Sequence, residues 1–324
     1  PDSHRNPEDR PDIAADHNQR MTTLTLTDFP LPQGVVRLND WGVIRATGAD
    51  ARSFLHGQLT QDTLHLDPGR ARLAGYCSPK GRLLASFVIW TEAASGDILL
   101  ACSADLLPAT LKRLSMFVLR AKCKLSDASA ERTLYGWAGA AVPGAQPWQV
   151  TEGAAGTALR LPDAAGQRRA LWLGAAPPVQ EALAPEGWQW LEVMSAVPRI
   201  VAATVEQFVP QMINLEAVGG VNFQKGCYPG QEVVARSQYR GTLKRRAFLV
   251  RSEAALQPGQ EVFDAADPEQ PAGMVVMAAA PAGLPAVALV ELKTAAAEGR
   301  LSAVSPEGPR LTVLPLPYDL PTEV

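Results

Sequence analysis

Residues 225–232, with the sequence KGCYPGQE, combine the residue types of a reactive loop. Gly226 and Gly230 enclose a cysteine, a tyrosine and a proline, a composition that predicts a tight, exposed loop. If a helix begins just after this loop, Cys227 lies near the helix N-terminus with Lys225 close in sequence, and both would favour the thiolate over the thiol. Cys227 is then a reactive or cluster-contacting thiol. The alternative is a small buried hydrophobe, which is what most free cysteines are.

A cluster of positive charge follows the loop: five basic residues fall within eleven positions, with no acidic residue among them. Such a cluster suits an anionic ligand, for example a polyglutamate tail or RNA phosphates. It is equally compatible with a solvated face beside acidic neighbours. The five residues are Arg236, Arg240, Lys244, Arg245 and Arg246.

Three tryptophans form the third chemical feature. Trp41 follows a predicted turn, and Trp188 and Trp190 precede a predicted helix. An indole can stack on a flat heteroaromatic ring, and its N–H needs an acceptor when it is buried. Core packing is the usual role of a tryptophan, so the residues alone leave both interpretations open.

Familiar catalytic and metal-binding motifs are absent from the sequence. There is no Gly-x-Ser-x-Gly elbow, no phosphate-binding Gly-x-x-x-x-Gly-Lys and no Gly-x-Gly-x-x-Gly after a strand. The four cysteines contain no Cys-x-x-Cys pair, and the four histidines are scattered. We therefore predict neither a disulfide framework nor a bound metal.

The composition limits the class of protein. A chain of 324 residues, 47% hydrophobic and 19% charged, predicts two or three folded domains. The net charge of -3 argues against a globally basic nucleic-acid binder. The longest uncharged stretch, 271–290, is interrupted by prolines and glycines, which predicts short strands around a turn rather than a membrane-spanning helix. Residues 1–20 are charged and contain no apolar run, so we expect a disordered extension, native or added, that is not a secretion signal. We therefore expect a cytoplasmic protein.

The hydrophobic pattern predicts an α+β arrangement of hairpins and single helices, followed by an all-β region. In the first part, strands are predicted over 35–38, 42–46, 72–77, 83–90 and 97–102, with helices after Gly48 and over 106–118. In the second part, the pattern predicts one isolated strand at 170–173 and helices at 179–183 and 191–197. Short barrel or sandwich strands are predicted at 247–251, 274–277, 286–292 and 311–314.

The KGCYPGQE loop resembles the signature of the YgfZ family. The likeness continues into Val234-Ala235-Arg236 and Tyr239-Arg240-Gly241, and it covers about residues 34–320. The eight-residue loop is its most specific part, and shorter blocks support it. These blocks are Phe54–Asp62, Ser78–Arg82, Phe208–Gln211, Asn214–Glu216 and Leu314–Tyr318.

This resemblance implies a folate-binding protein that acts in tRNA modification and keeps iron–sulfur enzymes active. It implies two α+β lobes, ferredoxin-like or T-protein-like, and a C-terminal β-barrel around a central folate pocket. We assign 21–130 to the first, folate-binding lobe, 131–243 to the second lobe, which carries the KGCYPGQE loop, and 244–324 to the barrel. The implied cofactor is tetrahydrofolate or a derivative, and the implied partners are iron–sulfur tRNA-modifying enzymes, met indirectly or transiently.

The resemblance also implies that two tryptophans flank the folate. Trp41 matches the first, and Trp190 matches the second, with Trp188 as a nearby competitor.

The remaining site residues come from the loop and the basic cluster. Arg236 or Arg240 would attract the glutamate carboxylates of the folate, and Tyr228 would contact the cofactor. Cys227 would be the reactive or cluster-facing group at the edge of the site, with its pKa lowered by Lys225.

One departure separates this chain from a related enzyme. The same superfamily contains the aminomethyltransferase (T-protein) of the glycine cleavage system, which has an essential aspartate in the strand after the first-lobe turn. The corresponding run here, 81–87, is GRLLASF and contains no carboxylate. Without that acid, another residue would have to stabilise the developing charge. We therefore expect an accessory protein. The second hypothesis is a one-carbon transferase with a repositioned acid. The third is weak tRNA contact through residues 236–246.

Overall fold

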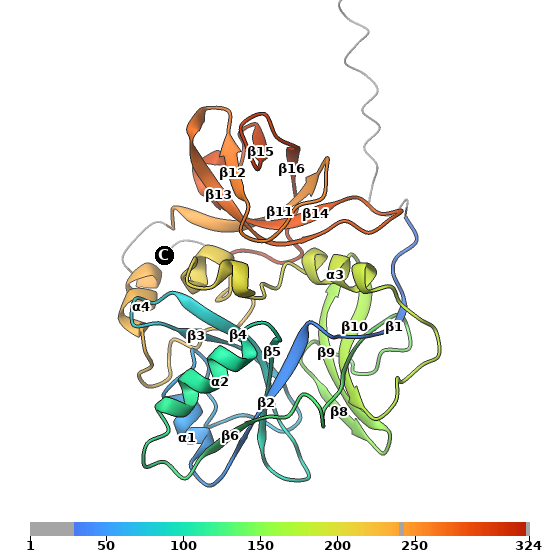
Figure 1. The fold of residues 1–324 in the computed structure, drawn as a ribbon, viewed down its shortest axis with the longest axis vertical. Helices are drawn as coiled ribbons and strands as arrows, with labels where there is room; N and C mark the ends of the chain where they lie inside the picture. Colours follow the sequence, from blue (N-terminus) through green and yellow to red (C-terminus); the bar gives the residue numbers. More distant parts are fainter. Residues whose placement is uncertain (1–28, 240–242, 322–324) are drawn as a thin grey trace, which may run out of the picture. The chain divides into compact units, whose positions relative to one another are not determined.

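The computed structural model describes residues 29–239 and 243–321, and the elements below belong to the unit that spans Leu31–Val324. These residues form two antiparallel five-stranded sheets and a closed barrel of six strands (Figure 1). The predicted α+β class and C-terminal barrel are confirmed. The extension predicted at 1–20 lies outside the described residues.

The first sheet packs its helices onto one face. Phe54, Leu55 and Leu114 of the helices pack against Ile44 and Leu100 of the strands in one buried cluster. The helices are α1 (Ala51–His56) and α2 (Leu107–Met116), the latter with Pro108 tolerated in its first turn. The strand order is β3 (Arg72–Cys77), β4 (Leu83–Thr91), β5 (Ile98–Ser103), β2 (Trp41–Thr47) and β6 (Lys124–Asp127).

The second sheet differs from the sequence prediction in two respects. The strand predicted in isolation at 170–173 lies in the middle of this sheet, because neighbouring strands form in the Gly- and Ala-rich sequence before it. The strands predicted over 35–38 and 42–46, both placed in the first part of the chain, enter different sheets, since the first of them pairs with Leu134–Ala138. The order is β1 (Gly34–Arg37), β7 (Leu134–Ala138), β10 (Gln167–Gly174), β9 (Gly156–Ala164) and β8 (Val150–Gly153).

The two helices predicted near residues 179 and 191 are replaced by one, α3 (Pro185–Met194). Residues 179–183 are not helical: the Val35 N–H donates to the Glu181 carbonyl, and the Leu183 N–H donates to the Val35 carbonyl. This backbone therefore extends the edge of the second sheet. The helix begins at Pro185, a residue suited to a first helical turn.

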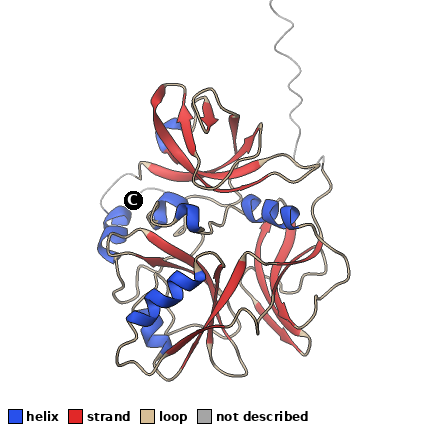
Figure 2. Cartoon of the chain, in the orientation of Figure 1, coloured by secondary structure: helices blue, strands red, loops and turns tan. Residues whose placement is uncertain are grey.

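The barrel strands are joined by loops and by one short helical turn, as Figure 2 shows. The uncharged stretch 271–290 supplies much of its central hairpin, in agreement with the prediction of strands. None of the helices in the described ranges has the length and apolar character needed to cross a bilayer. The barrel order is β11 (Arg245–Ser252), β14 (Val287–Lys293), β13 (Asp267–Ala279), β12 (Glu261–Asp264), β15 (Leu301–Ala303) and β16 (Arg310–Leu314).

The segment between α3 and the barrel returns to the first sheet. The Leu83 N–H donates to the Phe208 carbonyl at 2.8 Å, and the Asn222 N–H donates to the Thr60 carbonyl at 2.9 Å.

The predicted domain boundaries after residues 130 and 243 fall between elements, and we keep them as a proposal. The remaining helical elements are η2 (Ala202–Thr204), η3 (Pro210–Ile213), α4 (Gln231–Tyr239) and η4 (Thr294–Ala296).

Candidate functional site

A small cavity lies where the two sheets meet the segment after α3. Its volume is about 30 Å³, enough for one or two water molecules. Both an apolar and a charged wall are present, which is unusual for a packed core. The residues that matter chemically are Trp41, Phe87, Trp148, Arg169, Glu192 and Arg199. We call this space the tryptophan cavity.

Arg199 covers the face of Trp41 inside the tryptophan cavity. Its guanidinium carbon lies 4.8 Å from the centre of the indole ring. The same guanidinium pairs with Asp40 at 2.7 Å and with Glu192 at 3.2 Å. Burial lowers the pKa of Arg199, but the two carboxylates outweigh this effect and raise it, while burial raises the pKa of Glu192. The Trp41 indole N–H is buried and has no acceptor among the described residues.

Arg169 is a buried cation without a close anion. It is 3% exposed, and no described carboxylate lies within 4.0 Å of it. Its Nε donates to the Pro162 carbonyl at 2.9 Å, and its guanidinium lies 5.8 Å from the Trp188 ring centre. Burial lowers the pKa of Arg169 to about 10. Buried charges in proteins are normally paired, so this one is suited to an acceptor group brought by a ligand.

A larger cleft of about 440 Å³ adjoins the tryptophan cavity and shares Glu192 and Arg199 with it. Its other walls include Asp105, in the turn between β5 and α2, and Met277 of the barrel. A bicyclic ring cannot enter the small cavity while Arg199 lies on Trp41. The cleft has the size typical of small-molecule sites.

The structure does not bring Trp41 and Trp190 together in the cavity. Trp190 is fully buried, and its indole N–H donates to the Pro285 carbonyl of the barrel at 3.0 Å. Trp188 is also buried and packs against Gly136. The second indole of the cavity is Trp148, which sequence reasoning missed. Trp148 has a φ of 69°, a conformation rare for a large side chain, and only the folded contacts of its loop place it there.

Cys227 lies on an exposed loop, which excludes the alternative of a buried hydrophobe. The structure has a helix just after the loop, as the sequence analysis considered: α4 begins at Gln231, shortly after Cys227. The side chain of Tyr228, the next residue in the loop, is buried, and this burial raises the pKa of its hydroxyl. None of these residues lines the tryptophan cavity or the adjoining cleft.

Lys225 fastens the Cys227 loop to the first sheet. Its ammonium donates to the carbonyl of Leu59 at 2.9 Å and to the carbonyl of His56, and it lies 4.7 Å from the Tyr228 ring centre. Burial lowers the pKa of Lys225 to about 8, with Asp62 and Cys227 acting in the opposite direction.

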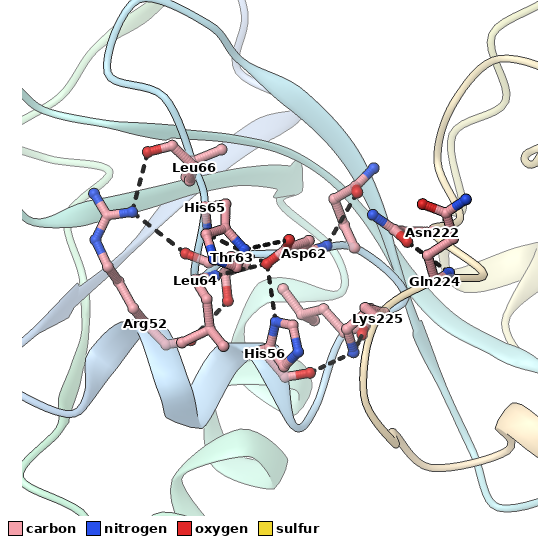
Figure 3. A network of polar contacts seen from close by, with 12 residues as sticks. Arg52, His56, Asp62, Thr63, Leu64, His65, Leu66, Asn222, Gln224 and Lys225 are labelled. Atoms are coloured by element: carbon pink, nitrogen blue, oxygen red, sulfur yellow. Dashed lines mark hydrogen bonds and ion pairs between the residues drawn. The ribbon is translucent and has the colours of Figure 1, made fainter.

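A His–Asp–His arrangement lies beside this lysine (Figure 3). The Nδ1 atoms of His56 and His65 lie 3.1 and 2.8 Å from the two carboxylate oxygens of Asp62; the first contact lacks hydrogen-bond alignment. Burial and Lys225 lower the pKa of His56. A Cβ atom on Gly226 would lie 3.5 Å from His56 Nε2, so the imidazole borders the loop. Sequence reasoning missed this cluster because the spacing of its histidines fits no motif.

The basic cluster after the loop is largely neutralised within the fold. Arg236 pairs with Glu232 at 3.0 Å, Arg245 pairs with Glu291, and Arg246 pairs with Glu216. Arg236 lines neither the cavity nor the cleft. Arg240 lies outside the described residues. No set of three or more His, Cys, Asp or Glu side chains within 29–239 and 243–321 is arranged to hold a metal ion.

Comparison with known proteins gives two kinds of likeness, although no protein-family model matches. The "tRNA-modifying protein YgfZ" of Edwardsiella ictaluri is 32% identical over 276 residues, which cover 77% of this chain and 76% of the relative. The protein of the same name from Vibrio vulnificus is 33% identical over 245 residues, covering 70% and 72%. Among solved structures, the glycine cleavage system aminomethyltransferase T from Bartonella henselae superposes with a TM-score of 0.61 over 90% of this chain and 87% of that one. Its identity is 16%, so this likeness concerns the fold.

Proposed function

Because this chain belongs to the YgfZ family of tRNA-modifying proteins, we propose that it is a cytoplasmic, folate-binding accessory protein for tRNA methylthiolation and iron–sulfur enzyme maintenance. The cofactor is tetrahydrofolate or a derivative. The observation that carries the proposal is the tryptophan cavity, where Trp41 and Trp148 accompany the buried, unpaired cation of Arg169.

The residues of the cavity fit a pterin ring chemically. Indole faces stack on flat heteroaromatic rings, and the unpartnered N–H of Trp41 needs an acceptor. Arg169 can donate to a ring carbonyl, and the Glu192 carboxylate can accept from the ring's amino group. Arg199 must first leave the face of Trp41, and it moves into the adjoining cleft in this proposal. A bound pterin would therefore replace one stacked cation by one stacked ring.

The test is calorimetric titration with tetrahydrofolate, supported by tryptophan fluorescence. We expect saturable binding that weakens at least about tenfold in Trp41→Ala and in Arg169→Met, because each loses a stacking or hydrogen-bonding partner. Trp172→Phe is the matched control, since Trp172 packs against Trp137 outside the cavity. Absence of binding at millimolar folate, or equal weakening in the control, would contradict the proposal.

Cys227 is the second functional element that we propose, as the reactive or cluster-facing group. It is exposed on the loop that precedes α4, where a thiol is accessible to a partner. We expect Cys227→Ala to lose tRNA methylthiolation in cells while keeping folate binding and the fold. An unchanged level of the modified nucleoside would show that the thiol is dispensable. A single cysteine cannot hold a cluster alone, so partner thiols would complete any such site.

One observation favours the second candidate function, one-carbon transfer to folate. Strand β4 lacks the expected acid, but the buried carboxylate of Glu192 lies in the tryptophan cavity and could replace it. Turnover of an aminomethyl or formyl donor with tetrahydrofolate, lost in Glu192→Gln, would support this role. Tight folate binding without turnover would leave the accessory role.

A further inference from the structure

A surface of apolar and basic residues projects from the first sheet where α2 ends and β6 begins. Leu119 is 86% exposed, Met116 is 62% exposed and Phe117 is 44% exposed. Four basic side chains on the same segment are also exposed. We call the seven residues the α2–β6 surface: Lys112, Met116, Phe117, Leu119, Arg120, Lys122 and Lys124.

The positive charges of the α2–β6 surface are unpaired. None of its four basic residues has a carboxylate within 4.0 Å among residues 29–239 and 243–321. The sequence from 106 to 126 contains no acidic residue. Arg236, Arg245 and Arg246, by contrast, each have an ion-pair partner. The α2–β6 surface therefore presents four cations without an ion-pair partner among the described residues, whereas three of the cations after the Cys227 loop are paired.

Backbone and core contacts anchor the segment that carries the α2–β6 surface at Val118, Lys122 and Lys124. The Lys122 N–H donates to the Asp50 carboxylate at 2.7 Å, and the Asp50 N–H donates to the Lys122 carbonyl at 3.1 Å. Lys124 belongs to β6 and pairs in register with Thr47 of β2. Val118 packs against the buried core beneath the surface. Lys122 and Lys124 are thus displayed from an anchored backbone, and the packed Val118 lies between the exposed Phe117 and Leu119.

We propose that the α2–β6 surface docks RNA at an unpaired loop. Lysine and arginine neutralise backbone phosphates, and the exposed ring of Phe117 stacks on an unpaired base. An acidic protein fits less well, because lysine is depleted at protein–protein interfaces and three of the four basic residues are lysines. The proposal goes beyond an accessory role in tRNA modification, which does not require contact with RNA, and it is independent of folate binding.

The first test is fluorescence anisotropy of the full chain with a labelled, unmodified tRNA stem-loop. We expect saturable binding whose log–log salt slope is about -2 to -3, since each phosphate contact contributes roughly 0.7 to 0.9. Lys122→Glu/Lys124→Glu should weaken binding at least about tenfold and flatten the slope by about 1 to 2. Arg300→Glu/Arg310→Glu on the barrel makes the same charge change at exposed positions and should have less than about a twofold effect.

The second test isolates the aromatic ring. Phe117→Ala should weaken binding to the stem-loop roughly tenfold, whereas Phe117→Tyr should restore it and Leu119→Ala should have little effect. Circular dichroism verifies that each variant is folded, as expected for exposed positions. Three results would overturn the proposal: no saturable RNA binding, equal weakening by the two charge-reversal variants, or binding of acidic partner protein or anionic vesicles through this surface without RNA binding.

Discussion

The tryptophan cavity and the Cys227 loop differ in how far the donors of their cations are satisfied. Neither cation has a carboxylate partner among the described residues, but the Lys225 ammonium donates to two backbone carbonyls, whereas the larger Arg169 guanidinium donates to one, that of Pro162. The ammonium of the loop's lysine thus has its acceptors within the fold, and Cys227 is exposed. In the cavity, the Trp41 indole N–H has no acceptor among the described residues. We therefore expect the cavity to enclose a ligand and the loop to present a reactive group.

The largest expected effect separates the two tryptophans that the sequence assigned to one role. Trp190→Ala should lower the free energy of unfolding by about 3–5 kcal/mol, because it empties a fully buried site between α3 and the barrel. Trp41→Ala should cost only about 1–2 kcal/mol, because its side chain is partly exposed. Urea denaturation of both variants measures the difference. Equal losses would mean that Trp41 is an ordinary core residue and would weaken the case for a ligand cavity.

A smaller effect tests how the Cys227 loop is joined to the first sheet. Gly230 has a φ of 79°, and a Cβ atom there would lie 2.4 Å from the Ser78 carbonyl oxygen. Gly230→Ala should therefore cost about 2–4 kcal/mol, from backbone strain and from the clash. Gly283 has a φ of 80° and nothing within 4 Å, so Gly283→Ala measures the strain alone, about 1–2 kcal/mol. If the two thermal denaturation curves shift equally, the loop does not pack closely on this turn.

Local chemistry made the loop more predictable than the cavity. The glycines, Pro229 and the following helical residues specify a turn and a helix through neighbours in sequence, and the structure has an exposed Cys227 followed by α4. Strands β3 and β4 were likewise predictable from their uninterrupted apolar runs. Their local structure is therefore readable from sequence, although the contacts of Lys225 and Gly230 with the first sheet are not.

The cavity depends on contacts that no local pattern encodes. Trp148 reaches it because its N–H donates to the Arg160 carbonyl and its own carbonyl accepts from the Ala71 N–H. Those bonds connect its loop to β9 and to the residues before β3. The charge pairing of Arg245 and Arg246 also depends on distant acids, so a cluster that looks like an anion site in sequence is mostly neutral in the fold. Arg169 shows the reverse, because burial without a partner cannot be recognised from sequence.

The lysine that fastens the loop should give a measurable pH dependence. Its folded pKa, about 8, lies below its ordinary value of 10.5, so between these values the unfolded chain holds a proton that the folded chain has released. Stability of the wild type should therefore rise with pH across this window relative to Lys225→Met, by about 1 kcal/mol after allowance for solvent screening. Lys80→Met, at an exposed position, is the control for alkaline titration elsewhere. If the stabilities of wild type and Lys225→Met change in parallel with pH, the carbonyl contacts stabilise the charged lysine enough to offset the cost of its burial.

The smallest expected effect on stability is that of replacing Cys227, because an exposed side chain contributes little to packing. Cys227→Ala should change the free energy of unfolding by less than about 0.5 kcal/mol, since the exposed side chain fills no cavity. In the native protein, a maleimide should label Cys227 rapidly. Cys77 and Cys102 should stay unlabelled, because burial removes them from the reagent and raises the pKa of each to about 12. Cys123 is partly buried and provides an intermediate case. If Cys227→Ala leaves the fast-labelling phase in place, the accessible thiol is another one, and the loop no longer contrasts with the enclosed cavity.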